Sequence, residues 1–158
     1  MTQSNTPLEI PEKGFFFVLQ PNETGATKSH QEGEIHVRKP LIGDVLPEIN
    51  APGQNIHQPF LLLNGLTGEF GDCTYTYWGG RHTPETRLRQ FPKAWKDEWE
   101  TDDLVVLIPF GPTRFIYFHL KPQGETPPGL EAAWRMAQRG HTSGRFTVGY
   151  RRRRAGNS

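Results

Sequence analysis

A group of charged side chains between Trp78 and Trp95 offers the clearest chemistry in this sequence. An arginine guanidinium donates two parallel hydrogen bonds to O6 and N7 of guanine, and a glutamate accepts one from N4 of cytosine. Lysine can contact phosphates, and histidine or glutamine can reach a base edge. The segment therefore suits recognition of a G·C base pair, and its candidate residues are Arg81, His82, Glu85, Arg87, Arg89, Gln90 and Lys93.

The same segment also fits a short, capped helix. Thr83 would be its N-cap, Pro84 would occupy the first helical position, and Glu85 would be favourable in the first turn. Both interpretations, a helix and a basic recognition loop, are open from these residues alone.

A second polar segment, residues 21–33, is dense in side chains that form hydrogen bonds. Two glycines, Gly25 and Gly33, allow another molecule to approach the backbone closely. Lys, Ser, Thr and backbone amides contact phosphates, and Gln or His can reach base edges. The segment is either an ordinary surface loop or a second contact region, with candidate residues Asn22, Thr24, Thr27, Lys28, Ser29, His30 and Gln31.

We find no arrangement of residues for catalysis. His119 and Lys121 match the His-x-Lys part of phospholipase D-type nucleases, but the aspartate that should follow is absent from residues 122–126. The acidic side chains of residues 97–103 lack the spacing of a calcium-binding loop and are expected to be solvated. Glycine-rich phosphate loops and nucleophile motifs are also missing. We therefore predict no catalytic residue, no metal ligand and no cofactor.

Composition favours one turn-rich domain. The chain has 158 residues, of which 17 are Gly and 14 Pro. Its one cysteine, Cys73, excludes an intramolecular disulfide and indicates a reducing, cytoplasmic setting. The polar N-terminus predicts no secretory signal, and no apolar run could cross a membrane. Residues 132–158 hold seven arginines and no acidic residue, so any nucleic-acid contact would be localised.

Hydrophobic periodicity predicts a mainly β protein. Strands are expected at residues 14–20, 34–38, 60–66, 73–78, 104–110, 113–120 and 145–150. Short amphipathic helices are expected at residues 39–50 and 129–139. Because the strands do not alternate with helices, a barrel or sandwich is favoured over a parallel sheet.

Residues 22–33, 37–50 and 77–95, in that order, resemble the N-terminal effector domain of EcoRII-type restriction endonucleases. The most distinctive match is Asn-Glu-Thr-Gly-Ala-Thr at residues 22–27, followed by His30, Gln31 and Gly33. The similarity extends over residues 15–120. It implies a DNA-binding pseudobarrel of seven strands and two short helices, the fold of the plant B-three transcription-factor domain.

The resemblance also implies two protruding segments that enter the major groove. Residues 21–33 correspond to the N-arm, in which His30 is the best-matched DNA-contacting position, and residues 81–90 to the C-arm. The family's Glu-x-Arg element matches Glu85 and Arg87 only with a shorter preceding loop, whereas a gapless match places Arg89 at the family's glutamate. The expected target is a short G·C-rich site similar to CC(A/T)GG in double-stranded DNA.

We therefore expect residues 1–150 to form a monomeric DNA-recognition domain in a bacterial or archaeal cytoplasm. The basic tail, residues 151–158, would contact phosphates or lead to a covalently linked nuclease domain, which alone would need Mg²⁺. Two alternatives remain: a small barrel that binds a peptide or carbohydrate on Trp78, Trp95 and Trp99, and a nuclease in its own right.

Overall fold

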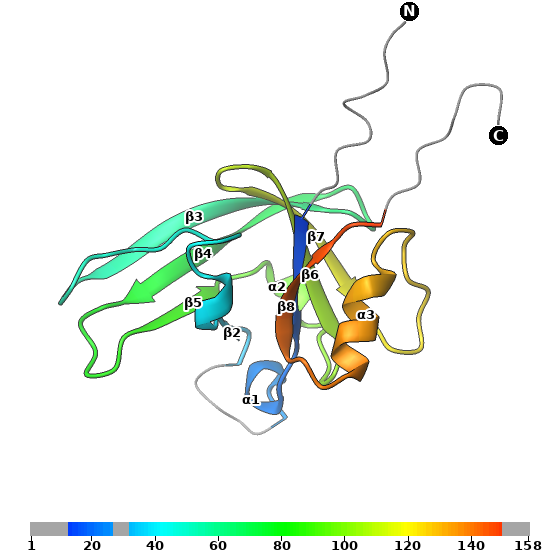
Figure 1. Ribbon diagram of the computed structural model, residues 1–158, viewed down its shortest axis with the longest axis horizontal. Helices are drawn as coiled ribbons and strands as arrows, with labels where there is room; N and C mark the ends of the chain where they lie inside the picture. The colour runs from blue at the N-terminus through cyan, green and yellow to red at the C-terminus, as the bar shows by residue number, and fades with distance from the viewer. Residues whose placement is uncertain (1–12, 27–31, 150–158) are drawn as a thin grey trace, which may run out of the picture.

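One strongly curled sheet dominates the computed structural model, which describes residues 13–26 and 32–149 (Figure 1). The eight strands follow the order β2-β5-β4-β3-β7-β6-β1-β8. Neighbouring strands are antiparallel except β3 and β7, which are parallel. The strands are β1 Lys13–Val18, β2 Ile35–His36, β3 Asn55–Asn64, β4 Phe70–Trp78, β5 Glu85–Arg89, β6 Leu104–Gly111, β7 Arg114–Leu120 and β8 Ser143–Thr147.

The sheet has an apolar cluster on each side because successive side chains of a strand point to opposite faces. In β1, Phe15 and Phe17 enter the larger cluster inside the curl, and Phe16 enters the smaller one outside it. The helix α3 (Glu131–Gln138) covers the smaller cluster, into which Ala133 is fully buried. The sequence thus predicted a mainly β fold with a helix near residues 129–139, and the structure confirms both.

The described residues form eight strands, where seven were expected, and the additional strand is β5. Its side chains alternate, with Leu88 buried in the inner cluster and Arg87 and Arg89 on the other face. Hydrogen bonding to β4 on one side and β2 on the other fixes this extended form. The capped helix that Thr83 and Pro84 would have started is therefore wrong.

The amphipathic helix expected over residues 39–50 is also wrong. Only a 3₁₀ turn, η2 (Lys39–Leu41), forms there. The chain then reverses at Gly43, whose φ is +85°, and the Leu46 amide donates to the Leu41 carbonyl over 3.1 Å. Leu41 and Leu46 are both buried, so the apolar spacing reflects an irregular loop packed on the core.

The segment 21–33 is not entirely a loop. One turn of α-helix, α1 (Pro21–Thr24), follows Gln20, whose backbone amide donates to the Glu23 carboxylate over 2.8 Å. Gly25 ends the turn with a φ of +85°. A second short helix, α2 (Lys93–Lys96), follows β5. Residues 27–31 and the arginines of residues 151–154 lie outside the described residues.

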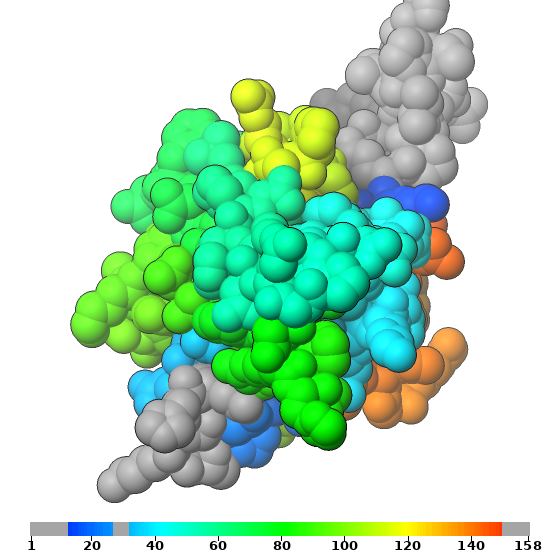
Figure 2. All heavy atoms as spheres, turned by 90° about the vertical axis from the view of Figure 1, so that its left-hand side faces the viewer, coloured from blue at the N-terminus to red at the C-terminus, as the bar shows by residue number. Residues whose placement is uncertain are grey.

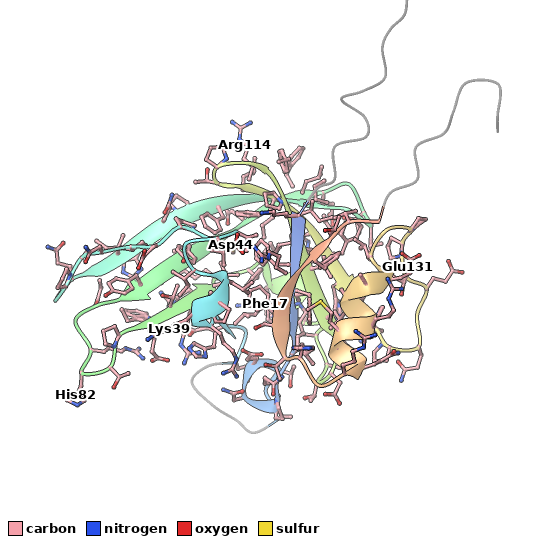
Figure 3. All side chains as sticks on the ribbon, viewed as in Figure 1. Phe17, Lys39, Asp44, His82, Arg114 and Glu131 are labelled. Atoms are coloured by element: carbon pink, nitrogen blue, oxygen red, sulfur yellow. The ribbon has the colours of Figure 1, made fainter. Side chains whose placement is uncertain are left out.

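The outer end of the β4–β5 hairpin projects from the body of the molecule. His82 lies at its tip, well away from the helix that begins with Glu131 (Figures 1 and 3). End on, the hairpin stands out beside the segment that contains η2 (Figure 2). We call residues 78–85 the hairpin tip. It lies in the part of the chain that the resemblance identifies as the C-arm.

Candidate functional site

Four neighbouring strands present a polar face on the outside of the curl. His36 of β2 is opposite Arg87 of β5, which is opposite Thr76 of β4. Thr76 is in turn opposite His57 of β3. Because alternate residues share a face, the same face includes their neighbours two positions away. We define the polar face as Glu34, His36, Asn55, His57, Thr74, Thr76, Trp78, Glu85, Arg87 and Arg89.

Two carboxylates organise three arginines on and beside this face. Glu85 accepts from Arg81 at the hairpin tip and from Nη2 of Arg87 over 2.7 Å. Glu34 accepts from Nε of Arg89 over 3.3 Å and lies 3.9 Å from Nε of Arg87. The network therefore crosses from the start of β2 to the hairpin tip, and it carries three positive and two negative charges.

Arg87 is the buried member of this network, with 4% of its surface exposed. Its Nη1 atom is buried, and no described residue accepts from it. Partial burial raises the pKa of Glu85, but the hydrogen bonds and charges of Arg87 and Arg81 outweigh it and hold the pKa below its usual range. Glu85 is therefore ionised at neutral pH, and its carboxylate is available as a hydrogen-bond acceptor.

Trp78 lies among the arginines. The guanidinium of Arg81 is 4.7 Å from the centre of its ring and that of Arg89 is 5.3 Å away. The His57 ring contacts the indole edge-on at 5.5 Å, and Nδ1 of His57 is 3.1 Å from the Thr76 hydroxyl. The side chains of this part of the face are therefore mutually packed.

Glu23 connects the start of the N-arm to the sheet. Its carboxylate accepts from the backbone amides of Gln20 and His36, over 2.8 and 3.0 Å. Its carbonyl accepts from the Gly33 amide over 2.8 Å. Burial raises the pKa of Glu23, although both backbone hydrogen bonds and the charges of Arg87 and Arg38 oppose the shift. The two ends of the N-arm are thereby held beside the polar face.

The structure describes only two of the candidate residues in the N-arm. Asn22 is half-buried, and the Thr24 hydroxyl is 2.9 Å from that of Thr101. Thr24 therefore stabilises the base of the N-arm against the acidic segment 97–103. The remaining five candidates lie outside the described residues, and they are Thr27, Lys28, Ser29, His30 and Gln31.

The C-arm candidates separate into two groups. Arg81, His82 and Glu85 belong to the exposed hairpin tip or its edge. Gln90 and Lys93 lie beyond the opposite end of β5, where the Gln90 side chain accepts from the Thr74 hydroxyl over 2.7 Å. Lys93, whose side chain is 82% exposed, pairs with Asp97. The structure thus brings Arg81, Glu85, Arg87 and Arg89 together, and leaves Gln90 and Lys93 at the margin.

Several members of the polar face were not singled out from the sequence, among them Glu34, His36 and His57. These residues alternate with inward-facing ones along neighbouring strands. Only the pairing register between the strands shows that they share one face. Arg38 lies two residues after His36, so it continues the same alternation, and it is exposed. Within the described ranges Arg38 forms no ion pair, although its charge opposes the rise in the pKa of Glu23.

A cavity of about 660 Å³ lies under the projecting hairpin. Tyr77 and Thr86 line it from the hairpin side, and Ile42 and Ile49 line it from the loop that follows η2. The hairpin tip therefore extends past the packed core and has space beneath it.

The other candidate clusters are structural. Asp103 is buried and its Oδ2 lies 2.7 Å from Nε2 of His119 and 3.1 Å from Nζ of Lys121. The His-x-Lys pair therefore anchors the end of β7 to the acidic segment. Trp99 is buried and Trp95 stacks on Tyr117, so the three tryptophans do not form the exposed platform of the peptide or carbohydrate alternative.

Within residues 13–26 and 32–149, no group of three or more His, Cys, Asp or Glu side chains could hold a metal ion. None of the helices in these ranges is long and apolar enough to cross a membrane.

Comparison with solved structures identifies the fold. The N-terminal domain of Helicobacter pylori LlaJI.R1 superposes with a TM-score of 0.57 at 7% identity, over 85% of this chain and 97% of that one. The B3 domain of the UbaLAI restriction endonuclease, crystallised with cognate DNA, gives 0.55 at 14% identity over 87% of each chain. No family model and no curated protein matches the sequence. The chain therefore has the B3-like pseudobarrel fold that its resemblance predicted.

Proposed function

We propose that this chain binds double-stranded DNA sequence-specifically, as the target-recognition domain of a restriction endonuclease. The observation that carries the proposal is the arrangement of Arg81, Glu85, Arg87 and Arg89 on a projecting hairpin and its adjoining face. The fold that presents them is shared with a restriction-endonuclease domain crystallised with cognate DNA. A two-stranded ribbon of this kind fits the width of the major groove.

The side chains of the hairpin have different roles in this proposal. The side chains of Arg81 and Arg89 are 48% and 25% exposed, so both can donate to guanine edges or phosphates, and Glu85 accepts from N4 of cytosine. Arg87 is too buried for a direct role, so it acts by orienting Glu85. A G·C-rich target such as CC(A/T)GG suits these donors and this acceptor.

The remaining candidates would set the position of the protein on the duplex. Phosphate contacts come from Lys28, Ser29 and Lys93, and from the arginines of residues 151–154 if that tail is not a linker. In the N-arm His30 and Gln31 reach base edges, as the resemblance implies, and Gln90 does so if it releases Thr74. Each phosphate contact adds affinity that salt weakens.

The wider setting is part of the same proposal. The domain acts as a monomer in a bacterial or archaeal cytoplasm, and cleavage belongs to a separate nuclease domain of the parent enzyme. Binding by this chain then needs no metal or other cofactor, whereas cleavage by the nuclease domain needs Mg²⁺. Affinity should accordingly be the same with and without EDTA.

Selection of the purified chain against random duplex oligonucleotides tests the proposal. The expected result is enrichment of one short G·C-rich motif, with the same affinity in EDTA and no cleavage in Mg²⁺. Equal retention of all duplexes would contradict sequence-specific recognition. Retention of single strands alone, or of none, would favour a different ligand class.

A further inference from the structure

We infer that Trp78 is a positioning residue of the proposed DNA-binding surface, where its indole holds Arg81 and Arg89 in the orientation that contacts DNA. The inference rests on the proposed function. It concerns a residue whose side chain would act through two arginines rather than through its own contact with a base.

Each of the two arginines is held at two points. Arg81 contacts the indole of Trp78 at 4.7 Å and donates to Glu85. Arg89 contacts the same ring at 5.3 Å and donates to Glu34 over 3.3 Å. An arginine fixed at only one point keeps most of its rotamers, so the second contact removes freedom that DNA binding would otherwise have to remove.

The indole is itself held in place. The His57 ring packs against it edge-on, and the Thr76 hydroxyl holds His57. Trp78 is also opposite Glu85 in the pairing of β4 with β5. The indole is therefore fixed on the same face as Glu85 and Arg89.

The indole N–H of Trp78 argues against a purely space-filling role. Its Nε1 atom is buried, and none of the described residues accepts from it. A phenylalanine would fill the position without burying an unpaired donor. The larger indole, however, attracts a cation more strongly than a phenyl ring does. The choice of tryptophan is therefore explained by its two arginine contacts.

A double-mutant cycle with the selected duplex tests this inference. Trp78→Leu should weaken binding about tenfold, as expected for two lost cation–π contacts, and Trp78→Phe should weaken it less. In the Arg89→Ala or Arg81→Ala background the effect of Trp78→Leu should be clearly smaller, because one contact is already absent. Trp134→Leu, on the half-buried tryptophan of α3, is the matched control and should leave affinity unchanged.

The outcomes separate the two proposals. If the wild-type chain binds no duplex, the proposed function fails. If it binds but Trp78→Leu costs the same factor in all three backgrounds, or nothing in any, Trp78 does not act through the arginines and the inference is overturned. Urea unfolding of each variant monitors the fold, and should Trp78→Leu be unfolded, the same cycle with Trp78→Phe decides the question.

Discussion

The two halves of the sheet differ in what covers their outer face. Around β1, β6 and β8 the outward side chains are apolar, and α3 packs over them. Around β2, β5 and β4 the outward side chains are charged or polar and pack against one another. Thr76 and Arg87 are buried there, whereas Glu34, Glu85 and Arg89 remain partly exposed. Both halves have the same alternation, so the difference lies in which residues occupy the outward positions. One half packs its outward side chains under a helix, and the other keeps charged side chains partly exposed, where the proposed function places the DNA contact.

The largest expected effect is on stability in the covered half. Phe16→Ala removes a fully buried ring beneath α3 and should lower the free energy of unfolding by about 3–5 kcal/mol. Urea denaturation measures the loss. At a temperature where the variant is still folded, its affinity for DNA should equal that of the wild type. A reduced affinity in the folded variant would mean that the two halves are coupled.

Arg87→Ala should lower both the stability and the DNA affinity, because Arg87 is buried and also orients Glu85. Removing it leaves Glu85 and Glu34 without a shared cation, and we expect a loss of about 2 kcal/mol in stability. DNA affinity should fall by a similar amount. Arg114→Ala, at an exposed arginine where β7 begins, well away from His82 of the hairpin tip (Figure 3), is the control and should change neither quantity.

Glu23→Gln tests how the start of the N-arm is held against the sheet. The amide cannot accept from both the Gln20 and His36 backbone amides, so stability should fall by about 1–2 kcal/mol at low pH. Burial raises the pKa of Glu23 above its ordinary value of 4.5. Its stabilising contribution is therefore complete below pH 4.5 and is lost as the pH rises through the folded-state pKa.

Thermal unfolding at a series of pH values measures this dependence. The difference between the wild type and Glu23→Gln should shrink from acidic toward neutral pH. A difference that grows with pH would show that Glu23 is stabilised in its charged form, which contradicts the burial argument.

The smallest effect is expected for Arg38→Ala. Its exposed side chain should contribute one phosphate contact, so all duplexes should bind more weakly by a similar factor. The slope of log affinity against log salt should become about one unit less steep. Titrations at several salt concentrations measure it, and an effect confined to one sequence would assign Arg38 to base recognition instead.

Strand alternation made much of this fold predictable. The aromatic residues of β1 and the apolar residues of β6 and β7 are long, regular runs, and all three strands form as expected. β5 was missed because Leu88 is its only large apolar residue, and because Thr83 and Pro84 resemble a helix start. Its extended form comes from pairing with β2 and β4, which are distant in sequence and carry no local signal.

The candidate site was predicted in part. Arg81, Glu85, Arg87 and Arg89 were identified by residue type, and they do lie together. The sequence could not show that Arg87 is buried or that Trp78 contacts two arginines, because both depend on register across β4 and β5. The loop at residues 39–50 illustrates the opposite error. There a helical spacing of apolar residues arises from an irregular loop that Gly43 and Pro47 prevent from becoming a helix.

Binding of the enriched duplex by the wild type and by Arg89→Ala is the most direct test of the account. We expect the wild type to prefer this duplex over single-base variants, and Arg89→Ala to lose about 1–3 kcal/mol of affinity with relaxed preference at one G·C position. Its stability should be almost unchanged. Equal binding of all duplexes by both proteins would contradict the claim that the hairpin tip and the polar face recognise DNA sequence.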